Sequence, residues 1–529
     1  MRSLIFLLAI SVFQIAFARS FARQSIHAAN QPGIEPRTGQ FVAATRAPLE
    51  TLRACSKLRS NFPNKLDQNI SIEYLSPGSQ DYITSSQDYW SDNCWQYAGC
   101  IFTPSNAGDL AKGMSIITTS QTVFSVRSGG HDFNVNHSSV GHEGVQIDLS
   151  SLNDISLGRN KESVIVGVGA RWGDVYQALS GSGVSVNGAR SPNPGVGGQT
   201  LGGGIGWLTG MAGATAASLI GAEVVLANST VIQVSEKHHP DLLWALRGGG
   251  GNFGIATSFT FKTLPIDKIW FEAKLYAADQ NQALLNALVE YQQLASKDLR
   301  ANVVFGLSQD SSAPQSFVGF LYLAPVESPP IFAPFSTIPA AEIMLNSTIG
   351  TLYDLSMGFY SPQYPEPGTV PLRHYVVSLP HKLDNSTYQE SFRSFVSHAK
   401  KAMAAGWAIN YGAQPISATA ANASFNTPLG LELVDQDWVH VDIQWQSPED
   451  DAAAMALIAS IGKDIAKSAD RHNAAVSYRF MNDAYDGQNV LSSYGKVNFR
   501  KLLAISKAFD PQGVFQRLQR GGWLLSREL

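Results

Sequence analysis

The stretch Arg127-Ser128-Gly129-Gly130-His131 decides how this 529-residue sequence is interpreted. It follows residues 122–126, an apolar run with the composition of a strand. Two adjacent glycines let the backbone approach a ligand closely and leave N–H groups for an anion such as a pyrophosphate. The histidine at the end of the loop would then lie beside the molecule that carries those phosphates.

Two further glycine clusters follow, GGQTLGGGIG at 197–206 and WALRGGGGNFGI at 244–255. Residues 249–254 formally match the dinucleotide motif G-x-G-x-x-G, which requires a strand before it and a helix after it. Here the order is reversed, because residues 241–247 have a helical pattern and residues 256–261 that of a strand. The sequence therefore does not indicate a Rossmann fold, and no cluster continues into the Gly-Lys-Ser/Thr of a P-loop.

In this order and spacing the clusters resemble the flavin-binding half of the vanillyl-alcohol-oxidase/PCMH-type flavoproteins. The match is closest to the berberine-bridge-enzyme-like FAD-linked oxidoreductases of fungal type, over residues 82–262 and again near the C-terminus. The resemblance implies FAD attached covalently through His131. It also implies FAD contacts from Arg127, Ser128, Gly129, Gly130, Asp132, Gly197, Gly198, Thr200, Gly203, Gly204, Ile205, Gly206, Gly254, Ile255 and Asn498.

The N-terminus predicts export. Residues 1–18 combine Arg2, an apolar run and an Ala-Phe-Ala cleavage signal, as in a secretory signal peptide. An N-terminal anchor helix is the alternative, but the run is too short and wrongly flanked to span a membrane. We expect a secreted protein with candidate glycosylation sites at Asn69, Asn136, Asn228, Asn346, Asn385 and Asn422.

The cysteines limit both disulfides and flavin attachment. The sequence has three, Cys55, Cys94 and Cys100, so an exported chain is expected to form one disulfide. Cys55 with Cys100 is favoured and Cys94 with Cys100 is the alternative. Many relatives add a thioether to FAD just before the second glycine cluster, where this sequence has Arg190. A second covalent link is therefore excluded.

Composition indicates a globular enzyme of two or more domains, with 44% hydrophobic and 15% charged residues. The net charge of −4 offers no basic surface for nucleic acid. Neither a Cys-x-x-Cys pair nor histidines at ligand spacing predict a metal site. We expect a monomer that acts on a small molecule.

The mixed order of strands, hairpins and helices predicts an α+β fold. We expect a PCMH-type two-subdomain FAD-binding domain at 19–265, with its core at about 96–265. An antiparallel-sheet substrate domain at 266–470, backed by helices at 279–295, 385–405 and 448–468, would follow. Residues 471–529 resemble the closing module of the family, which returns to the FAD domain.

Catalytic candidates lie on the strand-like stretch 438–446, which alternates apolar and polar residues. An exposed sheet face would explain the polar side, but the resemblance implies that this side covers the flavin. Many relatives carry an active-site tyrosine where this sequence has Phe480, which cannot accept a proton. The base must then come from elsewhere, or the reaction needs none. The catalytic candidates are His440, Asp442, Gln444, Tyr485 and Tyr494.

Flavin chemistry suggests the reaction. Flavin N5 accepts a hydride from a C–H bond next to oxygen or nitrogen, and O2 is the simplest final acceptor, giving H2O2. We expect oxidation of an alcohol, or oxidative cyclisation, of a fungal secondary metabolite. A carbohydrate oxidase acting at an anomeric hydroxyl is the main alternative, and a flavin-binding protein with little turnover is another.

Overall fold

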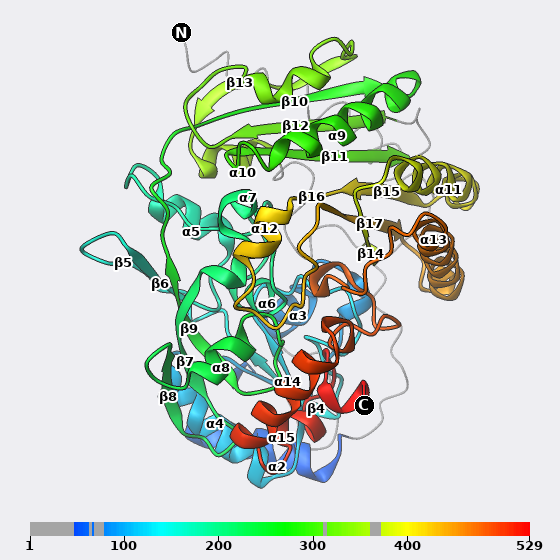
Figure 1. The fold of residues 1–529 in the computed structure, drawn as a ribbon. Helices are drawn as coiled ribbons and strands as arrows, with labels where there is room; N and C mark the ends of the chain where they lie inside the picture. The colour runs from blue at the N-terminus through cyan, green and yellow to red at the C-terminus, as the bar shows by residue number, and fades with distance from the viewer. Residues whose placement is uncertain (1–46, 63–65, 68–78, 310–314, 360–371) are drawn as a thin grey trace.

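The computed structural model describes residues 47–62, 66–67, 79–309, 315–359 and 372–529. The predicted signal peptide and the sequon at Asn69 lie outside these residues. The expected α+β class is confirmed: the described chain forms a sheet with parallel strands and two antiparallel sheets, with helices packed on them (Figure 1).

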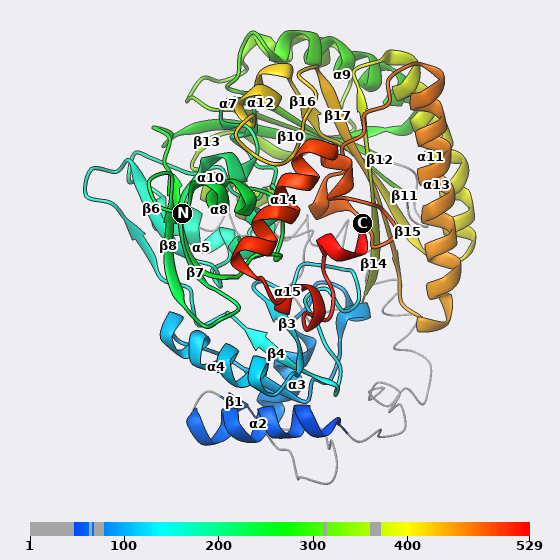
Figure 2. The same ribbon diagram turned by 60° about the horizontal axis from the view of Figure 1, so that its bottom comes forward.

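The first sheet has the strand order β1 (Leu66–Asp67), β2 (Cys100–Phe102), β4 (Gly144–Asp148) and β3 (Val123–Arg127). Strands β2, β4 and β3 run parallel, and β3 leads directly into the Gly129-Gly130 loop. Helices α2 (Leu49–Asn61) and α4 (Ala107–Thr119) pack beside this sheet, and α3 (Gln80–Gln87) lies close by (Figure 2). The disulfide joins Cys55 of α2 to Cys100 of β2, which is the favoured pairing.

The second sheet is antiparallel, in the order β5 (Ile155–Leu157), β6 (Ser163–Gly167), β9 (Ile255–Lys262), β7 (Leu219–Val225) and β8 (Val231–Ser235). Strands β7 and β8 form the predicted hairpin. Helix α8 (Pro240–Leu246) begins with a proline at its first position and precedes β9. The third glycine cluster therefore follows a helix and enters a strand, as the sequence pattern predicts. Helices α5 (Trp172–Leu179), α6 (Val196–Leu201) and α7 (Thr209–Ala212) complete this half.

The third sheet belongs to the central part of the chain. Its order is β13 (Glu342–Gly350), β10 (Ile269–Ala277), β12 (Gln315–Tyr322), β11 (Ala301–Gln309), β15 (Ala408–Ala413), β17 (Gln436–Trp445) and β14 (Arg373–Lys382), with β16 (Pro415–Ile416) paired to β17. Val439, Val441 and Ile443 are buried in a cluster with residues of α9 (Asn281–Ala295), α11 (Asn385–Ala404) and α13 (Asp451–Arg471). The alternate residues of β17 therefore face the FAD-binding half. The short helices α10 (Leu352–Phe359) and α12 (Ala418–Ala423) lie at the junction (Figure 1).

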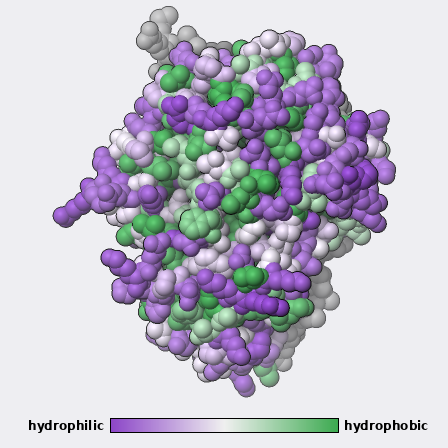
Figure 3. All heavy atoms as spheres, in the orientation of Figure 1, coloured by the Kyte–Doolittle hydropathy of each residue, from purple (hydrophilic) through white to green (hydrophobic). Residues whose placement is uncertain are grey.

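The C-terminal segment returns to the first half of the chain. Phe124 of β3 donates its N–H to Leu518 O and accepts from Arg520 N, at 2.8 and 2.7 Å. Helices α14 (Lys496–Phe509) and α15 (Val514–Arg517) lie against the glycine-rich half in both ribbon views (Figures 1 and 2). Among the described residues, no helix is long and apolar enough to cross a membrane. On the face drawn in Figure 3, hydrophobic residues form small patches separated by hydrophilic ones.

Candidate functional site

A cavity of about 540 Å³ lies between the third sheet and the glycine-rich half. All three glycine clusters contribute to its wall, and strands β15 and β17 face them from the other side. This volume is typical of cofactor and ligand sites. The predicted cofactor residues that line it are His131, Ser128, Gly129, Gly130, Asp132, Gly197, Gly198, Ile205, Gly254 and Ile255.

The glycines of the cavity wall are required by close backbone contacts. A Cβ on Gly129 would lie 2.3 Å from Gly195 N, and one on Gly130 would lie 2.3 Å from Asp88 O. Gly130 also has a φ of +65°, which favours glycine. A Cβ placed on Gly198 would have no neighbouring atom within 4 Å, so the backbone of Gly198 faces open space. This cradle fits the diphosphate and ribityl chain of FAD, which need close backbone approach.

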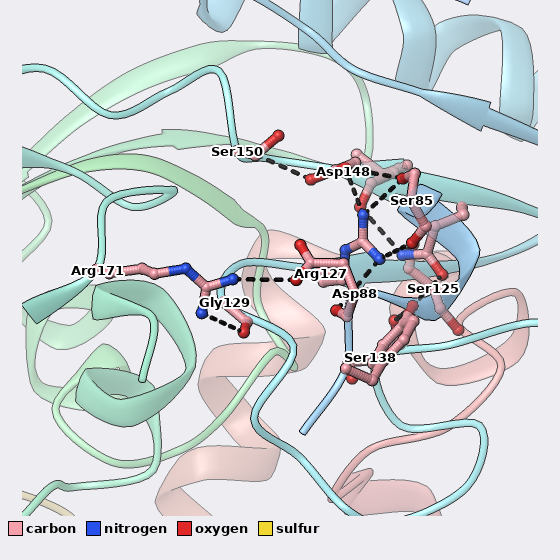
Figure 4. Close-up of polar contacts among 12 residues, drawn as sticks. Ser85, Asp88, Ser125, Arg127, Gly129, Ser138, Asp148, Ser150 and Arg171 are labelled. Atoms are coloured by element: carbon pink, nitrogen blue, oxygen red, sulfur yellow. Dashed lines mark hydrogen bonds and ion pairs between the residues drawn. The ribbon is translucent and has the colours of Figure 1, made fainter. Parts of the chain in front are cut away.

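Two side chains hold the first cluster in place. Arg171 Nη1 donates to Gly129 O at 2.9 Å (Figure 4). It also donates to Asn193 O at 2.6 Å. Ser128 Oγ donates to Val168 O at 2.6 Å and accepts from Gly197 N at 3.3 Å. The first and second clusters are thereby fixed to each other before any ligand binds.

Arg127 does not line the cavity, so the structure gives no support to its predicted FAD contact. As the last residue of β3 it points to the opposite side of the strand from Val126 and Ser128, which line the cavity. Its guanidinium donates to Asp148 Oδ2 at 2.5 Å and to Ser85 (Figure 4). Burial opposes the charge of Arg127, but Asp148 raises its pKa, and Arg127 in turn holds the pKa of Asp148 below its usual value.

His131 lies in the cavity wall, stacked on Trp90 and within the electrostatic influence of Arg171. Its ring is stacked on Trp90 at 5.3 Å between centroids and 8° between planes. Burial, together with electrostatic interactions with Arg171 and His374, lowers the pKa of His131 to about 3. The imidazole is therefore neutral at physiological pH, so that a ring nitrogen keeps a lone pair for bond formation.

Asp442 is brought into the cavity wall by β17, as predicted, together with His440 and Gln444. Its carboxylate accepts from His374 Nδ1 at 3.3 Å, Asn410 Nδ2 at 3.1 Å and Gln444 Nε2 at 2.6 Å. Burial alone would raise the pKa of Asp442, but these donors keep it below its usual value. An ionised carboxylate whose oxygens are already hydrogen-bonded is a weak proton acceptor, so Asp442 is better suited to positioning its neighbours.

A second polar group connects Arg190 to Asp483. Arg190 Nη1 donates to Gln414 Oε1 at 2.5 Å, which fixes the amide of Gln414. Gln414 Nε2 then donates to Asp483 Oδ2 at 2.9 Å and lies 3.2 Å from His440 Nδ1. Burial raises the pKa of Asp483, which also lines the cavity, and thereby makes it a stronger base.

The other catalytic candidates do not reach the cavity. Tyr494 is buried, stacks on Tyr478 and donates its hydroxyl to Gly248 O at 3.1 Å, so it is a core residue. Tyr485 packs on Tyr375 with ring centroids 5.5 Å apart. Phe480 does line the cavity and presents an apolar ring there.

Five predicted cofactor contacts are also absent from the cavity wall. Asn498 donates to Pro428 O at 3.0 Å and so connects α14 to the preceding loop. Thr200 lies on the buried side of α6. The chain then turns with positive φ at Gly203 and Gly204, and Gly206 packs against Gly188 O. The predicted cofactor residues that do not line the cavity, and whose FAD contacts remain predictions, are Asn498, Thr200, Gly203, Gly204 and Gly206.

Several site residues carry no sequence signal that could have identified them. Trp90 precedes the glycine-rich half, and His374 and Asn410 lie on strands that the register of the sheet brings beside β17. Gln414 lies between β15 and β16. Asp483 lies three residues after Phe480 in the closing module, but nothing in that stretch distinguishes it. Cys94, the free cysteine, is buried beneath the loop with Sγ 3.2 Å from Asp132 O.

A glycine-lined cradle, a neutral histidine at its end and a polar sheet opposite define a flavin-binding enzyme of the oxidoreductase class. Residues 98–235 match the family described as FAD binding domain. The FAD-dependent monooxygenase AOL_s00215g279 of Arthrobotrys oligospora is 35% identical over 84% of this chain and 86% of its own length. The FAD-dependent monooxygenase yanF of Aspergillus niger is 31% identical over 85% of this chain and 78% of its own length.

Solved structures share the fold. The berberine bridge enzyme of Eschscholzia californica superimposes with a TM-score of 0.70 at 16% identity, covering 87% of this chain and 97% of its own. The xylooligosaccharide oxidase of Myceliophthora thermophila C1 superimposes with a TM-score of 0.68 at 17% identity. The match covers 89% of this chain and 99% of the oxidase chain. The chain belongs to the berberine-bridge-enzyme-like family of PCMH-type FAD-linked oxidoreductases.

Proposed function

We propose that this chain is a secreted oxidoreductase that holds FAD through a single covalent bond to His131. Its substrate would be a fungal secondary metabolite, which is oxidised at an alcohol or cyclised oxidatively. When bound, the flavin supplies N5 as acceptor for a hydride from a C–H bond next to oxygen or nitrogen, with O2 as the proposed final acceptor, giving H2O2. A relative named bifunctional solanapyrone synthase, 29% identical over 80% of this chain, supports a natural product as substrate.

The neutral imidazole of His131 carries this proposal. It ends the loop whose bare backbone forms the cradle, and burial lowers its pKa to about 3. One attachment point is expected, because the only free cysteine, Cys94, lies beneath the loop and Arg190 occupies the position where many relatives have a cysteine.

We assign proton transfer to Asp483 and His440. The raised pKa of Asp483 suits a general base that takes the substrate hydroxyl proton. His440, which lines the cavity beside Gln414, would hydrogen-bond the substrate oxygen through its ring. Asp442 stays ionised and positions Asn410 and Gln444 at the same wall. Phe480, where relatives often have tyrosine, excludes water from this side of the cavity without exchanging a proton.

Acid precipitation tests the attachment. The purified protein is precipitated with trichloroacetic acid, and flavin absorbance is measured in the redissolved pellet and in the supernatant. We expect the absorbance in the pellet for the wild type and for H142A, a matched control because His142 is outside the cavity wall. We expect it in the supernatant, or absent, for H131A. A yellow pellet from H131A would contradict the attachment site, and a colourless wild type would contradict the cofactor.

Export and glycosylation belong to the same proposal. The sequon residues Asn228, Asn346, Asn385 and Asn422 are exposed and open to modification. Asn136 is half-buried and its Oδ1 accepts from Gln96 Nε2 at 3.0 Å, so we expect it to be modified least. Mass loss on treatment with an N-glycosidase, and N-terminal sequencing of protein from the culture medium, would test these expectations.

A carbohydrate oxidase is the second candidate, supported by the polar wall that Asn410, Gln444 and Asp442 form. Fold neighbours named as xylooligosaccharide and chitooligosaccharide oxidases share the architecture at 17% identity. Rapid reduction of the bound flavin by cellobiose or xylobiose would favour this candidate. Slow bleaching with every donor would favour a binding protein with little turnover. We further expect a monomer, which size-exclusion chromatography can test.

A further inference from the structure

One row of the third sheet changes from apolar to polar across the cavity. Register pairs join Leu275 to Phe317, Phe317 to Gly306, Gly306 to Gly412, and Gly412 to His440. All five residues line the cavity. The row therefore begins with the apolar residues Leu275 and Phe317 and ends with His440. Two glycines lie between them.

The two central glycines make room for the flanking rings. A Cβ on Gly306 would lie 2.0 Å from Phe317 Cε1, and a Cβ on Gly412 would lie 2.1 Å from His440 Cε1. Phe317 and His440 thus lie over the glycine backbones, one from each side. Any substrate held on this part of the sheet contacts an apolar ring at one side and a hydrogen-bonding ring at the other.

The apolar side is extended by Met344 and Val304. Ala273 pairs with Leu345 while Lys274 pairs with Ile343, so Met344 is the extra residue of a β-bulge in edge strand β13. Bulges turn a side chain out of the regular alternation, and Met344 lines the cavity. The polar side is extended by Asn410 and Asp442 in the next row, which the register pairs directly. Ser308 and Gln315 continue that next row as polar residues and also line the cavity.

This division restricts the substrate. A sugar has hydroxyl groups around its whole ring, and those facing Leu275, Phe317 and Met344 would lose hydrogen bonds to water without replacement. A hydrocarbon group on that side gains from leaving water. We propose that the substrate is amphipathic, with an oxygenated ring at His440 and a hydrocarbon substituent at Leu275, Phe317 and Met344. This inference deepens the proposed function and rests on it for the identity of the reaction.

Isothermal titration of the holoprotein with phenol, 4-propylphenol, 4-hexylphenol and cellobiose tests the inference. We expect the affinity for the phenols to rise up to about three- to fourfold per methylene until the apolar side is filled. Cellobiose should bind more weakly than 4-hexylphenol. The substitution M344N should reduce the gain from the alkyl chain. The matched control I343N changes the neighbouring residue, which is 55% exposed and does not line the cavity, and should keep the gain.

Three results would overturn the inference: affinity independent of chain length, tighter binding of cellobiose, or equal loss in M344N and I343N. Binding is measured as heat and does not depend on turnover. A colourless acid pellet would therefore reject the covalent flavin without deciding the substrate class, and the titration would reject the substrate class without deciding the flavin.

Discussion

The indole of Trp90 lies parallel to the imidazole of His131, with 5.3 Å between ring centroids and 8° between ring planes. The same indole stacks on His374 at 3.9 Å, and His374 donates to Asp442. Trp90 N also donates to Gly130 O at 2.9 Å, and Ser91 Oγ accepts from His374 N at 2.9 Å. The segment around Trp90 thus connects the glycine loop to β14 and sets the plane of the histidine ring.

Replacing Trp90 should slow flavin attachment. Loss of an aromatic contact of about 0.5–1.5 kcal/mol predicts attachment about two- to tenfold slower in W90L. W90F, which keeps a ring, should stay close to the wild type. The measurement is the time course of acid-stable flavin after FAD is added to protein produced without it. Equal rates for W90L and the wild type would show that the stack does not orient His131.

Replacing Asp483 should remove the proton acceptor. D483N should lower kcat about 10²- to 10⁴-fold with unchanged acid-stable flavin. Since the base must be ionised, wild-type kcat/KM should rise with pH through the raised pKa of Asp483, above the ordinary value of 3.8. The residual activity of D483N should lack this acid limb. Exposed Asp279 supplies the control D279N, which should match the wild type. An unchanged pH profile in D483N would exclude the assignment.

Asp437 should make stability fall as pH rises. It is fully buried in β17, and burial raises its pKa from 3.8 to about 7. The folded state therefore holds this proton more tightly, and stability decreases between about pH 4 and pH 7 as the unfolded chain ionises first. The side chain of D437N stays neutral at every pH. Its free energy of unfolding should therefore lack this decrease, which amounts to up to about 4 kcal/mol in the wild type. Tm values at pH 4, 5.5 and 7 for D437N and the wild type provide the comparison. Parallel Tm curves would contradict the prediction.

The Cys55–Cys100 disulfide should stabilise the N-terminal sheet. It closes a loop with a sequence separation of 45 residues between α2 and β2. The entropy of the closed loop in the unfolded chain predicts that the double variant C55A/C100A has a free energy of unfolding about 2–4 kcal/mol lower than the wild type. Thermal unfolding measures it, with reduction of the wild type as an independent route to the same loss. An unchanged Tm after both treatments would show that α2 is held by packing alone.

The sequence predicted the parts of the site that depend on local backbone. The glycine clusters, the helix-before-strand order at α8 and β9, and the alternation of β17 all follow from spacing within a short window. Arg127 was predicted with its loop neighbours but does not line the cavity, because a strand turns alternate residues to opposite sides and the loop motif alone does not say which side faces the ligand.

The partners of Asp442 that sheet register brings to it could not be predicted. His374 and Asn410 come from β14 and β15, which are separated from β17 by helices and loops, and only the pairing brings them beside Asp442. Tyr494 and Asn498 were assigned from the closing module, where a resemblance places the segment but does not distinguish core-facing from cavity-facing side chains. For the same reason Asp483, which lines the cavity, was not among the predicted candidates.

Mass spectrometry of the flavin peptide tests the central claim most directly. Trypsin should release residues 128–159 as one peptide, since no lysine or arginine lies between Arg127 and Arg159. After removal of N-glycans and digestion, we predict that visible absorbance co-elutes with this peptide. Its mass should be raised by that of FAD less two hydrogen atoms, with fragmentation placing the addition on His131. Unmodified peptide 128–159 together with free FAD would contradict the account.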